Sequence, residues 1–304
     1  MVAATASAQD AAPDDQTINV LGRKQTEAQA RQEANDFVRR TGIANGEAPV
    51  ARWVGPVCPR VLGIQPEYAT IVERRVRSIA EKADIPLGAA PCTANVVISF
   101  ATNAKAVVQR VAKKSPRRIS EVPLPARAAL LKGNAPIRWW YTTQETSADG
   151  IGATSSDGLA ANSGTAEGGG SSIGNGLPTV QAYSSSIIRT QVVRALRSAP
   201  VVIDVTLSEG APLDAVAAYA AMVAFAEIKP NREPPPNSIL GLFGETAPSA
   251  SATDWDINFL RALYSIPPAR AGWKQRRMLV GEIMKGAEAA GQIAEDDLTE
   301  GLEN

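Results

Sequence analysis

The chain has 304 residues, and 31 Lys and Arg side chains balance 31 Asp and Glu side chains. With 44% hydrophobic and 20% charged residues it is a globular chain, without the roughly 18-residue apolar run of a membrane-spanning helix. The balanced charge argues against a general binder of nucleic acid or anionic membranes, and the absence of histidine excludes Ser-His-Asp, Cys-His and HExxH chemistry.

The first 16 residues are rich in alanine and end in an acidic stretch. Ala6-Ser7-Ala8 followed by Gln9 matches the small-residue cleavage site of a secretory signal peptide. We therefore interpret residues 1–16 as the disordered remnant of such a peptide. The chain is then an exported bacterial protein, periplasmic or secreted, with a single α+β domain over residues 17–292.

Two cysteines are present, Cys58 and Cys92, and they do not form a CxxC motif. Without histidine they make a poor zinc site. In an oxidising compartment they would form one disulfide that closes a loop of about 34 residues. The alternative is two unrelated buried thiols.

The first half of the domain alternates between helices and short strands. Thr26 and Gln29 fit a capping box, Pro66 suits the first turn of a helix, and Asn103 can cap a third helix. In chain order we predict a strand at 17–21, a helix at 26–40, a helix from 66 to about 83, a strand at 95–100 and a helix from 104.

The second half contains the most apolar helix of the chain, from Leu213 to Ile228, which is apolar on all sides and therefore central. Thr253 can cap a later helix. In chain order we predict a strand at 137–143, a flexible Gly/Ser-rich loop at 147–176, strands at 179–190 and 201–207, helices at 213–228, 254–264 and 273–290, and an acidic tail at 293–304. These elements predict an α+β fold with a mixed sheet, an antiparallel edge, a buried central helix and C-terminal helices.

Aromatic residues are concentrated in the strand at 137–143. Strand alternation places Trp139 and Tyr141 on one face of the sheet and Trp140 on the other. One face is therefore a candidate groove for sugars or peptides, since aromatic rings stack on both. The alternative is that these rings fill the two layers of a helix-covered sheet.

Three carboxylates, Asp204, Glu209 and Asp214, surround the junction between the last strand and the apolar helix. A pair of carboxylates could perform acid–base hydrolysis without histidine. The alternative is that they cap turns and helix starts.

Six basic residues follow one another between Lys105 and Arg118 without an acid. They could bind phosphate or lipopolysaccharide-like anions. The alternative is the solvated face of an amphipathic helix.

Three segments of the second half carry a resemblance: Ala220–Ile228 in the apolar helix, Ser238-Ile239-Leu240 after it, and Asp256–Tyr264 with the spacing D-x-x-x-L-x-x-L-Y. Together they resemble the zincin-like metallopeptidase fold, and in particular uncharacterised exported bacterial proteins that lack the HExxH residues. The likeness covers about residues 95–264.

The resemblance implies an inactive enzyme. The positions of the two metal ligands and of the general base hold Ala220, Ala224 and Ala221, which can neither bind zinc nor activate water. We therefore expect no cofactor and no metal. The former cleft, with Tyr219 and Glu227 at its rim, would bind an envelope protein, a peptide or a glycan, and no nucleic acid.

Overall fold

The computed structural model describes residues 25–147, 190, 192–244, 250–291 and 293. It has the expected α+β architecture, in which seven helices accompany a five-stranded mixed sheet. The expected signal-peptide remnant at 1–16 and the strand at 17–21 lie outside the described residues. So do positions 148–176 of the Gly/Ser-rich loop, 179–189 of the next expected strand and 294–304 of the acidic tail.

The sheet is mixed, with antiparallel pairing at one edge as predicted. Its strands are β1 (Pro59–Leu62), β2 (Val96–Ala101), β3 (Ile137–Trp139), β4 (Thr142–Ser147) and β5 (Val192–Asp204). β1, β2 and β5 run parallel in that spatial order. β3 and β4 each pair antiparallel with the long β5. The short β1 was not predicted.

The expected single strand at 137–143 is wrong, because β3 and β4 are separate strands with Trp140 and Tyr141 between them. The break faces Pro200 of β5, whose carbonyl accepts from the Trp140 backbone N–H over 3.3 Å. Proline has no N–H to return a second bond, so the ladder is interrupted there. The strand expected at 201–207 is also corrected, since β5 begins at Val192 and ends at Asp204.

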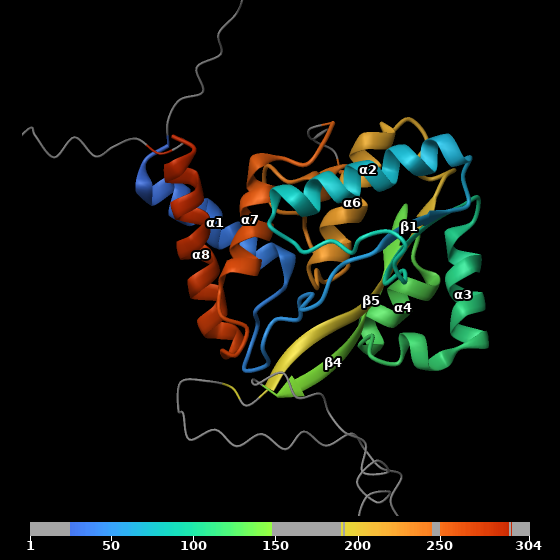
Figure 1. The fold of residues 1–304 in the computed structure, drawn as a ribbon, viewed down its shortest axis with the longest axis horizontal. Coiled ribbons are helices and arrows are strands. Elements are labelled where there is room, and N and C mark those ends of the chain that lie inside the picture. The colour runs from blue at the N-terminus through green and yellow to red at the C-terminus, as the bar shows by residue number, and fades with distance from the viewer. Residues whose placement is uncertain (1–24, 148–189, 191, 245–249, 292, 294–304) are drawn as a thin grey trace, which may run out of the picture.

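Helices cover both faces of the sheet, as Figure 1 shows: α2 and α6 lie on one side, and α3 and α4 on the other. The remaining helices, α1, α7 and α8, gather at the left of that view. The helical segments are α1 (Glu27–Thr41), α2 (Pro66–Lys82), α3 (Ala104–Lys114), η1 (Pro116–Ile119), α4 (Leu124–Lys132), α6 (Leu213–Phe225), η2 (Ile239–Gly241), α7 (Asp254–Ser265) and α8 (Gly272–Ala289).

Capping signals place the helix starts correctly. Thr26 with Gln29 and Thr253 with Asp256 both form complete capping boxes, and the Asn103 side chain accepts from the Ala106 N–H. α4 and η1 were not predicted; Pro123 precedes α4, and neither it nor Ser115 before η1 forms a side-chain capping bond.

The apolar helix α6 is central, as its composition predicts, but it ends at Phe225 and not at Ile228. Ten of its 13 residues are buried, and it packs against α2, β5, η2 and α7. In the described part of the chain, no helix combines the length and the hydropathy of a membrane-spanning segment. Because α6 is buried and is packed by elements on several sides, it forms the centre of the hydrophobic core.

The two cysteines form a disulfide, Cys58–Cys92, with their Cα atoms 6.1 Å apart. The bond joins the residue before β1 to the loop before β2, and it closes a loop with a sequence separation of 34. It reinforces the pairing of the two strands, in which Pro59 faces Val96.

Replacing both cysteines, C58S/C92S, is expected to lower the free energy of unfolding by about 3–4 kcal/mol, because the open loop regains its entropy in the unfolded chain. Urea unfolding at pH 7 measures the difference. Reduction of the wild type with dithiothreitol should give the same loss. A loss below about 1 kcal/mol in both samples would contradict this role of the disulfide.

Candidate functional site

One cavity of about 460 Å³ brings together three of the four residues proposed for binding, Trp139, Tyr141 and Glu227. Its walls come from the strands β3, β4 and β5, from α4 with the loop before it, and from the segment that follows α6. Charged side chains of both signs line it: Glu121, Glu145, Arg194, Glu227 and Lys229. It is therefore a mixed aromatic and charged pocket.

The C-terminal end of α6 is buried at this pocket, and its carbonyl groups need donors. The Met222 carbonyl accepts from the Ala226 N–H. Aromatic side chains donate to the next three carbonyls: Tyr141 Oη to Val223 at 2.7 Å, Trp53 Nε1 to Ala224 at 2.9 Å, and Tyr264 Oη to Phe225 at 2.8 Å. Every carbonyl of the last turn is thereby satisfied.

Tyr141 is the link between the helix end and the pocket. Its hydroxyl also lies 2.8 Å from the Ala226 carbonyl and accepts from the Ile228 N–H at 3.1 Å. Burial, together with the nearby charge of Glu227, holds the pKa of this hydroxyl well above its usual value. Tyr141 is therefore a permanent donor near neutral pH.

The two tryptophans are mostly covered. Trp139 exposes 9% of its surface and donates from Nε1 to the Ile228 carbonyl at 3.0 Å, while Trp140 exposes 4%. As predicted, Trp139 and Tyr141 pack on one core and Trp140 on the other. Their rings mainly fill the two layers of the fold.

Tyr219, the fourth residue proposed for binding, does not line the 460 Å³ pocket. Its ring meets Trp139 edge-on, with 6.0 Å between the centroids. Both rings line a smaller neighbouring cavity of about 110 Å³. Trp139 therefore lines both cavities, while Tyr219 is not brought together with Tyr141 and Glu227.

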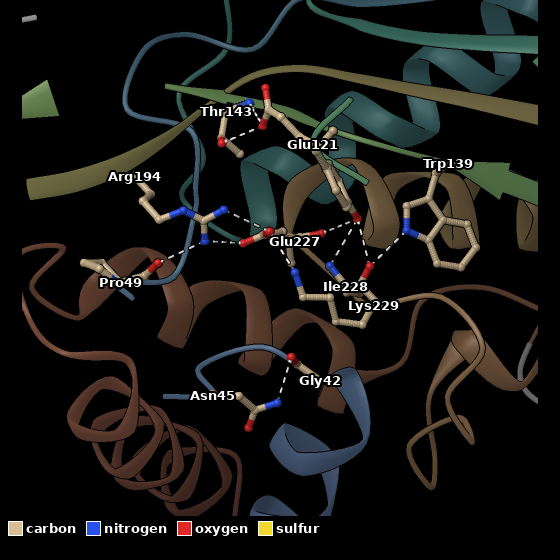
Figure 2. Close-up of polar contacts among 12 residues, drawn as sticks. Gly42, Asn45, Pro49, Glu121, Trp139, Thr143, Arg194, Glu227, Ile228 and Lys229 are labelled. Atoms are coloured by element: carbon tan, nitrogen blue, oxygen red, sulfur yellow. Dashed lines mark hydrogen bonds and ion pairs between the residues drawn. The ribbon is translucent and has the colours of Figure 1, made fainter. Parts of the chain in front are cut away.

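Glu227 forms ion pairs with two basic residues of the pocket, and Figure 2 shows it between Arg194 and Lys229. Arg194 donates two hydrogen bonds to its carboxylate, at 2.8 and 3.1 Å, and Lys229 Nζ donates one at 2.8 Å. Burial alone would raise the pKa of Glu227. The bonds from Arg194 and the charges of Lys229 and Arg194 outweigh burial, so its pKa lies below the ordinary value.

A second carboxylate, Glu121, lies at the rim of the same pocket (Figure 2). It accepts from the backbone N–H and the hydroxyl of Thr143, each at 2.8 Å. The bonds tie the loop before α4 to strand β4. They fix one wall of the pocket against the other.

Two of the three carboxylates considered for hydrolysis, Asp204 and Asp214, have separate partners. Asp204 is buried and accepts from the backbone N–H groups of Ala104 and Leu207, at the start of α3 and in the turn after β5. Asp214 accepts two bonds from Arg75 of α2, at 2.6 and 3.2 Å, which lower its pKa. Glu209 is exposed. Asp204 and Asp214 thus serve as a cap and an ion pair.

The three alanines that the expected zincin-like resemblance places at ligand and base positions lie inside the core. Ala220, Ala221 and Ala224 are fully buried. Within the described residues, no group of three or more Cys, Asp or Glu side chains is arranged to hold a metal ion. The pocket lies beyond the end of the helix, beside Glu227, and not over these alanines.

Sequence reasoning missed Arg194, Lys229 and Glu121. Lys229 is two residues from Glu227, and this short separation in the sequence could have indicated that the two side chains form an ion pair. Arg194 gave no such signal, because it reaches Glu227 from 33 positions away across the fold. Glu121 lies in a loop before a helix that was not predicted.

Comparison of the chain with family models, with curated proteins and with solved structures finds no match. The zincin-like resemblance therefore stays a prediction from short motifs. A proposal about function has to rest on the geometry of the pocket itself.

Glu227→Gln is expected to lower the free energy of unfolding at pH 7 by about 2 kcal/mol, because the amide leaves Arg194 and Lys229 without a charged partner. The folded pKa of Glu227 lies below that of the unfolded chain. Its carboxylate therefore stabilises the fold above the unfolded pKa and loses this effect as pH falls through the folded pKa.

Urea unfolding at pH 7, 5 and 3 tests this, and the difference between the two proteins should shrink below about pH 4. Glu282→Gln is the matched control, because Glu282 accepts one bond from Lys285 on the surface of α8 and should contribute little. A pH-independent difference, or an equal loss in the control, would count against the buried ion pair.

Proposed function

We propose that this chain is an exported, non-enzymatic bacterial protein whose catalytically dead zincin-like domain binds a peptide segment, free or within an envelope protein. The observation that carries the proposal is that Trp139, Tyr141 and Glu227 line one cavity of about 460 Å³. Pockets of this size that combine apolar walls with a few placed polar groups are typical of ligand sites.

The lining favours a peptide over a glycan. Sugar recognition by stacking needs an open aromatic face, and Trp139 and Trp140 expose only 9% and 4% of their surfaces. The charged groups are more accessible: Lys229 exposes 43% of its side chain, and Glu121 and Glu145 are exposed at the rim. Both signs of charge suit a peptide, which offers ammonium, carboxylate and amide groups.

The absence of catalysis is supported by the same residues. The resemblance would require metal ligands and a base at Ala220, Ala224 and Ala221, and all three are buried alanines. The rival hydrolase needs two free carboxylates that face one substrate. Asp204 and Asp214 instead bind partners on two different helices.

Export is supported by two independent features. The Cys58–Cys92 disulfide suits an oxidising compartment. The Ala6-Ser7-Ala8 sequence matches a signal-peptide cleavage site. A peptide-binding protein of the cell envelope agrees with both.

Ala126→Trp tests the pocket by filling it, since Ala126 of α4 lines the cavity. Ala128 lies on the same helix, is exposed and does not line the cavity, so Ala128→Trp is the matched control. The immobilised proteins are incubated with a random-sequence peptide library, and retained peptides are identified by mass spectrometry.

We expect retention by the wild type and by A128W, and at least tenfold weaker retention by A126W, because the indole occupies the ligand volume. The peptides should be recovered intact. Equal retention by all three proteins would contradict binding in this pocket, and cleaved peptides would overturn the non-enzymatic proposal.

A further inference from the structure

The helical layer formed by α3, η1 and α4 has a net positive charge, although the net charge of the whole chain is zero. Residues 104–133 contain a single acid, Glu121, and eight basic residues: Lys105, Arg110, Lys113, Lys114, Arg117, Arg118, Arg127 and Lys132. The layer, which we call the basic cap, has a net charge of +7, so the rest of the chain has −7. Figure 1 shows it on the side of the sheet opposite α2 and α6.

The positive charge of the basic cap is not neutralised by its surroundings. In the described part of the chain, none of its eight Lys and Arg side chains forms a salt bridge. Its single acid, Glu121, is bound to Thr143. Six of the eight basic side chains are exposed. An anion is therefore the complementary partner.

A buried arginine beneath the cap holds α4 in place. Arg138 of β3 is 2% exposed and donates to the carbonyls of Leu130 at 2.9 Å and Gly133 at 2.6 Å, at the end of α4. The guanidinium replaces the missing donors of the helix end. The cap is thus a fixed part of the fold.

The cap also carries the most exposed large hydrophobic side chain of the described residues. Leu124 exposes 75% of its surface, and Pro123 and Pro125 flank it. Arg127 donates to the carbonyls of Ser120 and Val122 and so fixes this turn beside η1. An exposed apolar side chain therefore lies at the start of α4, in a turn fixed by Arg127.

We propose that the basic cap docks onto an anionic lipid bilayer, with its cations over the phosphate headgroups and Leu124 inserted between them. The cations are spread over three helical segments, which suits a charged surface better than a single phosphate. A soluble polyanion would attract the cations and leave Leu124 in water. Bilayer binding uses both features. It does not depend on a ligand in the pocket.

Vesicle sedimentation at 50 mM salt tests the proposal with the full chain. We expect binding to phosphatidylglycerol–phosphatidylcholine vesicles, none to pure phosphatidylcholine, and release at 500 mM salt. Each cation near an anionic surface strengthens partitioning about fivefold. R117E/R118E should therefore weaken binding at least about 25-fold, and K113Q/K114Q should weaken it five- to 25-fold.

The matched control is R74E/R277E, which changes the net charge of the chain by the same amount at exposed, unpaired arginines of α2 and α8. It should weaken binding less than about threefold, because these sites lie outside the cap. L124S should weaken binding about tenfold through the lost apolar insertion. Circular dichroism confirms the fold of each variant.

Three results would overturn the proposal. The first is no binding to anionic vesicles at 50 mM salt. The second is an equal loss in R117E/R118E and R74E/R277E, which would mean that only the overall charge matters. The third is L124S binding like the wild type while soluble heparin competes fully, which would assign the cap to a soluble polyanion.

Discussion

The buried end of α6 is the constraint on which the rest of the structure depends. The helix is apolar on every side, so it has no side chain of its own to satisfy its last carbonyl groups, and water does not reach them. Trp53, Tyr141 and Tyr264 supply the donors from three distant parts of the chain. These bonds therefore fix three other parts of the chain against the end of α6: the segment before β1, the break between β3 and β4, and helix α7.

The same constraint shapes the pocket. The chain leaves α6 directly at Glu227, where the helix dipole already concentrates negative partial charge. A carboxylate there is unfavourable by itself, and Arg194 and Lys229 offset both the carboxylate and the dipole. The Tyr141 hydroxyl is hydrogen-bonded to carbonyl groups at the helix end. Tyr141 therefore contributes its ring to the pocket lining, and its hydroxyl is not free to donate to a ligand. The binding that we propose for the pocket would therefore depend on charged groups more than on aromatic faces.

Features encoded within a few residues could be predicted from the sequence. The Thr26 and Thr253 caps act over three positions, and the burial of α6 follows from its composition alone. Features made by contacts across the fold could not be predicted. The strand break depends on Pro200 lying opposite Trp140, and the pocket depends on Arg194 reaching Glu227, so neither leaves a pattern near the residue concerned.

Two residues of the segment on which the expected zincin-like resemblance rests form hydrogen bonds that connect elements of the fold. Asp256 accepts from the Ser238 hydroxyl at 2.6 Å and from the Ile239 N–H at 2.9 Å, which fixes η2 to the start of α7. Tyr264, at the other end of the motif, donates to the end of α6. The Asp256 bonds thus connect η2 with α7, and the Tyr264 bond connects α7 with the end of α6. The packing of α6 therefore depends on these polar contacts and on the close fit of its small alanine side chains, including Ala220, Ala221 and Ala224.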